Sequence, residues 1–181
     1  LLARGGLEVQ LGTRTPDQAE AIATARENER YLPGVRLPEA IEVRPSSQIE
    51  LAGIDLVCLA VPSASYPQAV GALSDRIGRR AAILLLAKGL IAPKGQLPSE
   101  YVTERIQTRG VSCLGGPAHA REAVSGSAAL VLGTSDEDLK AQLGNVFDKA
   151  GLVCERSGDV IGVEMAGAAK NAAVLAAAAA E

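Results

Sequence analysis

Two lysines in apolar surroundings are the residues of this sequence best suited to chemistry. Lys170-Asn171 lies among glycines and alanines in the C-terminal segment 158–181. Small residues let a ligand or another backbone come close, and a lysine that loses water tends toward a lower pKa, which suits a general base. The alternative is a core helix whose lysine extends to solvent. Local sequence alone favours that alternative, so the rest of the chain has to decide.

Lys88 is the second such lysine, because it ends the apolar run 81–87 and precedes Gly89. In an open parallel sheet, ligands bind beyond the carboxyl ends of the strands. This rule predicts a functional Lys88. It also selects other residues that follow predicted strands: Arg14, Pro62, Ser63 and the turn Gly115-Gly116-Pro117.

Arg14 bears on the choice of cofactor. A dinucleotide fold that prefers NAD often has an acidic residue at this strand end, whereas an arginine can pair with a 2′-phosphate. Arg14 therefore favours NADP, or both cofactors, unless it is only an exposed arginine at a strand end. His119, the only histidine, is flanked by Arg121 and Glu122, which are typical of a solvated segment. We therefore look for a general base among the lysines.

Strands and helices alternate along most of the chain. This alternation predicts an α/β fold with a Rossmann-like, doubly wound, mainly parallel sheet, followed by the first helix of an all-α domain. The predicted boundary separates an NAD(P)-binding domain, 1–157, from the start of a helical substrate-binding domain, 158–181. The runs 54–61 and 81–87 are so continuously apolar that we expect both to be central strands. The other expected strands are 7–13, 41–44, 111–114, 128–133 and 152–156, and the expected helices are 15–27, 46–51, 67–76, 97–108, 120–123 and 135–149.

Three helix ends have predicted signals. Thr15 is the expected N-cap of helix 15–27, with Pro16 at its first position. Ser135 and Asp138 form a capping pattern at the start of helix 135–149. Residues 1–5 are expected to be the last turn of a helix that Gly5 or Gly6 ends.

Composition excludes several classes of protein. Hydrophobic residues make up 48% of the chain, which argues against disorder. A net charge of −3 with no basic run argues against a nucleic-acid partner. The longest apolar run, 172–180, is too short to span a membrane. Three widely spaced cysteines without a CxxC pair predict no metal site, and each is expected to be a buried free thiol of a cytoplasmic protein.

The two ends suggest that the sequence is a fragment. No GxGxxG loop lies between a first strand and helix, although a nucleotide-binding fold would need one. We expect that loop before Leu1 and the rest of a helical domain after Glu181, and we expect the fragment alone to be inactive. A missing central strand would leave the inner edges of two strands unpaired.

Taken together, these residues resemble the NAD(P)-dependent glycerol-3-phosphate dehydrogenases of bacterial type. The matching pieces follow the order of the family and span nearly the whole chain. The last of them, from Asp159 to Asn171, is the most specific. The pieces are Asn28 with Tyr31-Leu32-Pro33-Gly34 and Leu37-Pro38; Val61-Pro62-Ser63; Lys88-Gly89; Gly116-Pro117 with Ala120 and Glu122; and Asp159-Val160-Ile161-Gly162-Val163-Glu164 leading to Gly167-Ala168 and Lys170-Asn171.

The resemblance implies reversible hydride transfer between NAD or NADP and sn-glycerol 3-phosphate, giving dihydroxyacetone phosphate for phospholipid synthesis. It implies that Lys170 accepts the proton and that Lys88 lies near both nicotinamide and substrate. The implied cofactor contacts are Arg14, Pro62, Ser63, Lys88 and Ala120, and the implied substrate contacts are Lys88, Gly116, Ala118, Lys170 and Asn171. The partner is then a small phosphorylated molecule, the location is the cytoplasm, and a homodimer is one candidate oligomeric state.

Two features depart from the family pattern, and two alternatives stay open. Ala118 and His119 stand where the family usually has a hydroxyl or amide residue and a phenylalanine, so Ala118 offers no hydroxyl to substrate. One alternative is another dehydrogenase that joins a Rossmann domain to a helical domain, such as a 3-hydroxyacid dehydrogenase or a ketopantoate reductase. The other is a non-catalytic nucleotide-binding domain. Lys88, the single histidine and the lead-in 159–164 nevertheless favour a catalytic Lys170.

Overall fold

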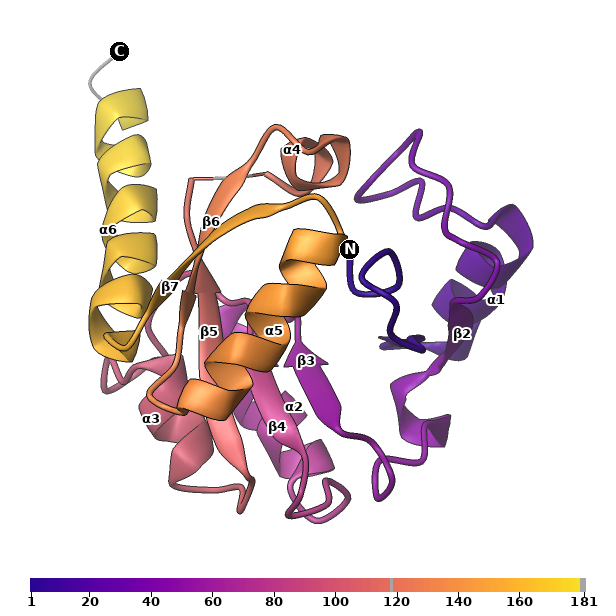
Figure 1. Cartoon of the computed structure of the whole chain (residues 1–181), viewed down its shortest axis with the longest axis horizontal. Helices are drawn as coiled ribbons and strands as arrows, with labels where there is room; N and C mark the ends of the chain where they lie inside the picture. The colour runs from indigo at the N-terminus through magenta and orange to yellow at the C-terminus, as the bar shows by residue number, and fades with distance from the viewer. Residues whose placement is uncertain (118, 180–181) are drawn as a thin grey trace. The chain divides into compact units, whose positions relative to one another are not determined.

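A computed structural model describes residues 1–117 and 119–179 of the chain (Figure 1). These residues form two compact units. The first contains residues 1–50, 118–128 and 145–153, and the second contains residues 51–117, 129–144 and 154–181. Seven strands and six α-helices follow one another in the described residues. They are β1 (Gln10–Thr13), α1 (Pro16–Ala25), β2 (Glu42–Pro45), β3 (Leu56–Leu59), α2 (Tyr66–Leu73), β4 (Ala82–Leu85), α3 (Pro98–Thr103), β5 (Gly110–Gly115), α4 (Ala120–Ser125), β6 (Ala129–Gly133), α5 (Glu137–Lys149), β7 (Val153–Ser157) and α6 (Val160–Ala179). Strands and helices alternate as the sequence predicts except between β2 and β3, where only a 3₁₀ turn intervenes.

The first unit is built on a two-stranded parallel sheet of β1 and β2. Thr15 caps the helix that follows β1, because its hydroxyl accepts a hydrogen bond from the backbone of Gln18 at 3.3 Å, and Pro16 occupies the first helical position, as predicted. Before β1, residues 1–6 form one helical turn. Gly6, with φ +91°, ends this turn while Leu7 N donates to Leu2 O, so the predicted glycine stop is confirmed.

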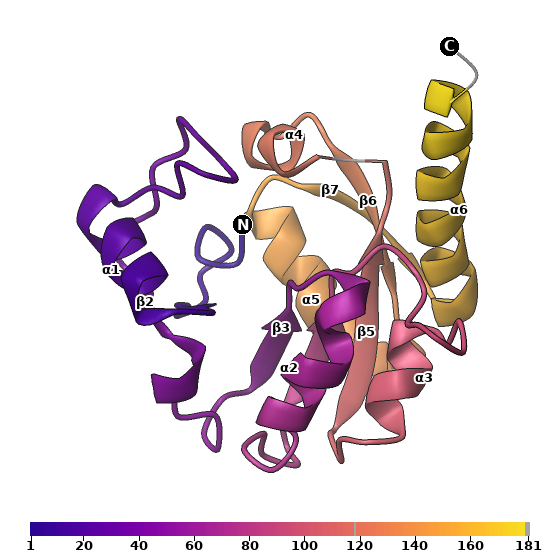
Figure 2. The same cartoon turned by 180° about the vertical axis from the view of Figure 1, so that it is seen from behind.

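The second unit holds a five-stranded sheet in the order β3-β4-β5-β6-β7. Strands β3, β4 and β5 run parallel, and β6 is antiparallel to β5. Figure 2 shows α2 and α3 on one face of this sheet, with α5 behind it. All four residues of β4 are buried, so the core centres on this strand. The predicted mainly parallel, Rossmann-like fold is confirmed.

One expectation about the sheet is wrong. The apolar run that contains β3 was expected to form a central strand buried on both faces, but β3 is the edge strand of the five-stranded sheet. Val57 and Leu59 are buried, whereas Leu56 and Cys58 are only partly buried. A long apolar run indicates that helices cover the faces of a strand, but it does not predict whether the strand has a neighbour on one side or on both.

Several predicted elements also have different ends. Every strand except β5 is shorter than or shifted from its predicted range, and β5 is one residue longer at each end. Helix α3 stops at Thr103, and the predicted helix 46–51 is a 3₁₀ turn, Ser46–Gln48. Helix α5 was expected to be capped by Ser135 together with Asp138. Instead Asp136 is the cap, since its carboxylate accepts a hydrogen bond from Leu139 N at 2.9 Å. Among the described helices, none is long and apolar enough to cross a membrane.

Candidate active site

The carboxyl ends of β3, β4 and β5 lie at the same edge of the sheet in the second unit. These strands are parallel neighbours, so the segments that follow them emerge side by side. The predicted residues Ser63, Lys88 and Gly116 are on these three segments. A Cβ atom built on Gly89 would lie 3.2 Å from Ser63 Oγ, so the loops after β3 and β4 are in close approach. The strand-end rule therefore brings these positions to one edge.

Lys88 is partly buried and turns its amine toward the loop after β5. Its Nζ donates a hydrogen bond to the carbonyl oxygen of Gly116 at 2.9 Å. Burial lowers the pKa of Lys88 below its usual value, and the charge of Lys170 lowers it further. The loops after β4 and β5 are therefore joined by a lysine whose charged form is disfavoured.

Lys170 reaches the same loop from helix α6. Its Nζ donates to the carbonyl oxygen of Pro117 at 3.0 Å, one residue after the carbonyl that holds Lys88. Gly167 lies one turn before Lys170 on the helix, and a Cβ atom built there would be 3.9 Å from Cγ of Lys88. The side chain of Lys88 therefore passes along α6 beside Lys170, and two cationic amines meet at one edge of the sheet.

Gly116 has a backbone conformation that requires glycine. Its φ is +124°, and a Cβ atom built there would lie 2.9 Å from Ala129 O and 3.1 Å from Leu130 Cα. This conformation turns the chain so that the carbonyls of Gly116 and Pro117 can each accept a lysine amine. The glycine predicted as a substrate contact is thus also the residue that shapes the acceptor loop.

Close packing against the sheet places helix α6. Val163 sits against two glycines, because a Cβ atom on Gly115 would be 2.6 Å from Val163 Cγ1 and one on Gly133 would be 3.2 Å from Val163 Cβ. At the start of the helix, the Asp159 carboxylate accepts a hydrogen bond from Gly162 N at 2.8 Å. Strands β5 and β6 therefore receive the first turns of α6 directly, and Lys170 follows two turns later.

The sequence interpretation gave Glu164 no role of its own. Its side chain is 7% exposed, and it is the only charged side chain that is buried among the described residues. The carboxylate accepts a hydrogen bond from Ser99 N at 3.0 Å and a second one from the Ser99 hydroxyl. Burial raises the pKa of Glu164, and the two bonds from Ser99 oppose that rise. The sequence did contain a signal for this residue, because Glu164 is a charged residue within an otherwise apolar predicted helix.

The remaining predicted residues are not all brought to the lysines. Arg14 follows β1 directly and is exposed, and Ala120 is the first residue of α4 and is also exposed. Both residues belong to the first unit, whereas Lys88 and Lys170 belong to the second. Ala118 lies outside the described residues, and so does the side chain of Asn171, whose backbone is part of α6. The predictions for these four residues stay predictions.

The sequence model described as "NAD-dependent glycerol-3-phosphate dehydrogenase N-terminus" matches residues 1–140 of this chain. The chain belongs to this family. The resemblance found from the sequence motifs is therefore confirmed.

Individual members of the family are also similar to this chain. The glycerol-3-phosphate dehydrogenase [NAD(P)+] of Deinococcus radiodurans is 39% identical over 176 residues, which are 97% of this chain and 52% of that protein. The protein of the same name from Chlorobium limicola is 34% identical over 98% of this chain and 54% of that protein. The chain therefore spans about half the length of the curated relatives it matches.

A solved structure shows the same fold. The glycerol-3-phosphate dehydrogenase of Plasmodium falciparum superposes with a TM-score of 0.85 at 24% identity, over 94% of this chain and 51% of that one. The α/β arrangement of strands β3–β7 with their helices is thus a fold that this dehydrogenase shares.

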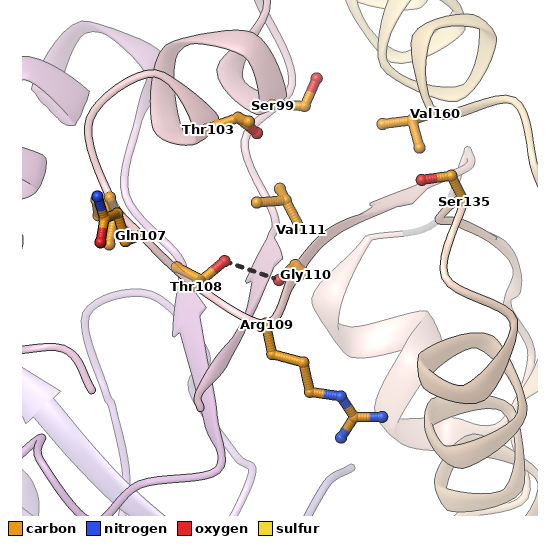
Figure 3. A pocket seen from close by; sticks show the side chains of 10 residues that line it. Ser99, Thr103, Gln107, Thr108, Arg109, Gly110, Val111, Ser135 and Val160 are labelled. Atoms are coloured by element: carbon orange, nitrogen blue, oxygen red, sulfur yellow. Dashed lines mark hydrogen bonds between the residues drawn. The ribbon is translucent and has the colours of Figure 1, made fainter. Parts of the chain in front are cut away.

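The hollow drawn in Figure 3 is not the place where this chain brings its two lysines together. It has a volume of about 480 Å³, and its lining includes Thr108, Gly110 and Val111 at the amino end of β5, whereas Lys88 and Lys170 reach the loop after the carboxyl end. The Thr108 hydroxyl is bonded to Gly110 O at 3.3 Å. Ser99 lies at the rim with its hydroxyl turned away from the hollow, consistent with its bond to Glu164. We therefore locate the candidate site at the lysine pair.

Proposed function

We propose that the protein carrying this chain is an oxidoreductase that interconverts sn-glycerol 3-phosphate and dihydroxyacetone phosphate with NAD or NADP. The observation that carries this proposal is the meeting of Lys88 and Lys170 at the carboxyl ends of parallel strands. The names of the relatives support the same reaction. The activity would supply glycerol 3-phosphate for phospholipid synthesis in the cytoplasm, by an enzyme that we propose to be a homodimer.

The residues present fit a nicotinamide dinucleotide. Arg14 is an exposed guanidinium directly after β1, and no ion pair is recorded for it among the described residues, so it is available to a 2′-phosphate. Ser63 and Gly89 leave a hydroxyl and bare backbone at the sheet edge, beside Lys88. We propose Arg14, Pro62, Ser63, Lys88 and Ala120 as the residues that would hold the cofactor. A bound nicotinamide would supply the acceptor for the hydride.

Lys170 is the proposed general base. Removing a hydride from the alcohol carbon requires that the hydroxyl proton leaves, and a neutral amine at Lys170 would take it. In the reverse direction the Lys170 ammonium would return the proton, while Lys88 would stabilise the developing charge on oxygen. Lys88 suits a place beside the reacting carbon, since burial and Lys170 both lower its pKa.

The two amines also suit a phosphorylated substrate. A phosphate dianion is attracted to a site where two cationic groups meet, and the attraction strengthens where water is excluded. We propose that substrate contacts Lys88, Gly116, Ala118, Lys170 and Asn171. Ala118 has no hydroxyl, so at that position only the backbone could donate a hydrogen bond.

Two alternatives remain less favoured. A ketopantoate reductase or 3-hydroxyacid dehydrogenase would also pair a lysine with an asparagine on a helix, but the family assignment and the relatives do not favour it. A non-catalytic nucleotide-binding domain would not need two lysines at the sheet edge.

The decisive experiment assays the purified full gene product with dihydroxyacetone phosphate and with ketopantoate, each with NADH and NADPH. We expect oxidation of the reduced cofactor with dihydroxyacetone phosphate only. Turnover of ketopantoate alone would replace the proposed substrate, and the absence of turnover with both would favour the non-catalytic domain. The chain assayed by itself serves as a comparison and is expected to be inactive.

A further inference from the structure

One face of helix α6 points along the candidate site. Val163, Gly167 and Lys170 are spaced by four and three residues, so they lie on the same side of the helix. Val163 packs on the glycines of β5 and β6, Gly167 lies beside the Lys88 side chain, and Lys170 reaches Pro117 O. Contacts along this one face hold the helix against the sheet, but they do not by themselves fix its rotation about its own axis.

Glu164 holds the helix from another side. It follows Val163 by one residue, so it projects about 100° around the helix from that face. There it receives both donors of Ser99, which are the backbone N–H and the hydroxyl near the start of α3. Contacts between α3 and α6 at this place connect the helix to a second element of the fold. This tether, the pair of hydrogen bonds from Ser99 to Glu164, lies to one side of the helix axis and therefore opposes rotation of α6 about that axis.

We infer that Glu164 and Ser99 are a positioning pair, which fixes the rotation of α6 and so holds the Lys170 amine beside Lys88. A small rotation of α6 would displace the Lys170 amine by a distance that matters for catalysis. At a side-chain radius of about 6 Å, a rotation of roughly 20° moves a side-chain tip by about 2 Å. Misplacement of a reacting group by about 1 Å can lower turnover by on the order of 100-fold.

The inference rests on the proposed function only where turnover is the readout, so the test has a second readout. In the full gene product, ¹³C labelling of lysine Cε allows the pKa of Lys88 to be followed by NMR. Lys170→Ala, which removes the neighbouring charge, shows how far the pKa of Lys88 rises when Lys170 is absent. Ser99→Ala removes the hydroxyl and keeps the backbone donor, so it is the milder way to loosen the tether.

The matched control is Ser112→Ala. Ser112 is another buried serine of the same unit, and its hydroxyl donates a hydrogen bond to Ile83 O at 3.1 Å within the sheet rather than to a residue of α6. We expect Ser99→Ala to raise the pKa of Lys88 in the same direction as Lys170→Ala, and Ser112→Ala to leave it unchanged. We also expect Ser99→Ala to lower kcat by about tenfold or more, with KM for NADPH kept within about twofold.

Glu164→Gln and Glu164→Ala complete the series. Glutamine keeps an acceptor for one of the two Ser99 donors, so its kcat should lie between those of the wild type and the alanine variant. If Ser99→Ala matches Ser112→Ala in the pKa of Lys88 and in kcat, the positioning role is overturned while the proposed reaction stands. If the wild type does not turn over dihydroxyacetone phosphate, the proposed reaction fails, and the pKa of Lys88 still decides the positioning role.

Discussion

Lys88 and Lys170 donate hydrogen bonds to the carbonyl oxygens of two consecutive residues, Gly116 and Pro117. The acceptor loop therefore sets the separation of the two amines, although they come from a strand end and from a helix. Carbonyl oxygens offset part of the repulsion between the ammonium groups without neutralising them. The carbonyl oxygens therefore hold the two amines side by side, where the proposed reaction would need them.

Replacing Lys170 tests the proposed base. In the full gene product, Lys170→Ala should lower kcat by at least about 100-fold, because general acid–base catalysis contributes roughly that much or more. The dissociation constant of NADPH, measured by fluorescence titration, should stay close to that of the wild type. Lys94→Ala is the control, since Lys94 is an exposed lysine in the loop between β4 and α3. Near-normal turnover of Lys170→Ala would remove Lys170 from the mechanism.

Replacing Gly116 tests the acceptor loop. Gly116→Ala should destabilise the fold by roughly 1–3 kcal/mol or more, because alanine is strained at φ +124° and its Cβ would lie 2.9 Å from Ala129 O. Urea denaturation measures the change in the free energy of unfolding. Gly53→Ala is the matched control, since a Cβ atom at Gly53 would meet nothing within 4 Å. Equal stability of the two variants would contradict the strained geometry of Gly116.

Replacing Arg14 tests the choice of cofactor. Arg14→Asp should raise KM for NADPH by about tenfold and change KM for NADH much less, because the guanidinium is proposed to pair with the 2′-phosphate. Arg30→Asp makes the same change of charge at another exposed arginine of the first unit. Steady-state kinetics with both cofactors measures the effect. If the two variants behave alike, Arg14 is an exposed arginine without a role in cofactor binding.

The pH dependence of stability tests the environment of Glu164. Burial raises its pKa above 4.5, so the folded state binds the proton more tightly than the unfolded state does. The resulting stabilisation is complete below pH 4.5 and is lost as the pH rises through the pKa of the folded state. Glu164→Gln does not titrate, so its free energy of unfolding relative to the wild type should increase from acidic toward neutral pH.

Urea denaturation at several pH values gives this comparison. The groups that interact electrostatically with Glu164 are Glu100, which adds to the rise of its pKa, and Tyr66 and Cys113, whose raised pKa values keep them neutral throughout the range. A difference in the free energy of unfolding between Glu164→Gln and the wild type that does not vary with pH would show that the pKa of Glu164 is not raised by folding.

The thiols give a test that does not depend on the proposed reaction. Burial raises the pKa of Cys58 to about 11 and that of Cys113 to about 12, so very little thiolate exists at pH 8. Both should resist iodoacetamide in the folded protein and react promptly in urea, as mass spectrometry of tryptic peptides would record. Rapid native labelling of Cys113 would contradict the packing between β5 and α6.

The sequence predicted those parts of the fold that depend on local pattern. The continuous apolar run before Lys88 predicted β4, whose four residues are all buried, and Thr15 with Pro16 predicted the start of α1. The same reasoning misplaced β3 as a central strand, because apolar continuity does not identify the neighbouring strands. It also gave no sign that β6 pairs antiparallel with β5, since that register depends on contacts distant in sequence.

The candidate site was predictable to a similar degree. The strand-end rule and the family motifs placed Lys88 and Gly116 together, and the motif around Lys170 added the second amine. The hydrogen bonds between Ser99 and Glu164 were not predictable, because the two residues are 65 positions apart and the sequence around either one does not indicate its partner. Buried charges are seldom visible in a sequence until the fold supplies their partners.

The same separation of 65 residues has a consequence for the order in which the protein assembles. Closing so long a loop before the intervening strands have formed would cost conformational entropy with little return. We therefore expect strands β4, β5 and β6 to pair with their neighbours first, and α6 to dock on the completed glycine surface afterwards. In that order the amines of Lys88 and Lys170 would approach each other only at the end of folding, so their repulsion would not oppose the earlier steps.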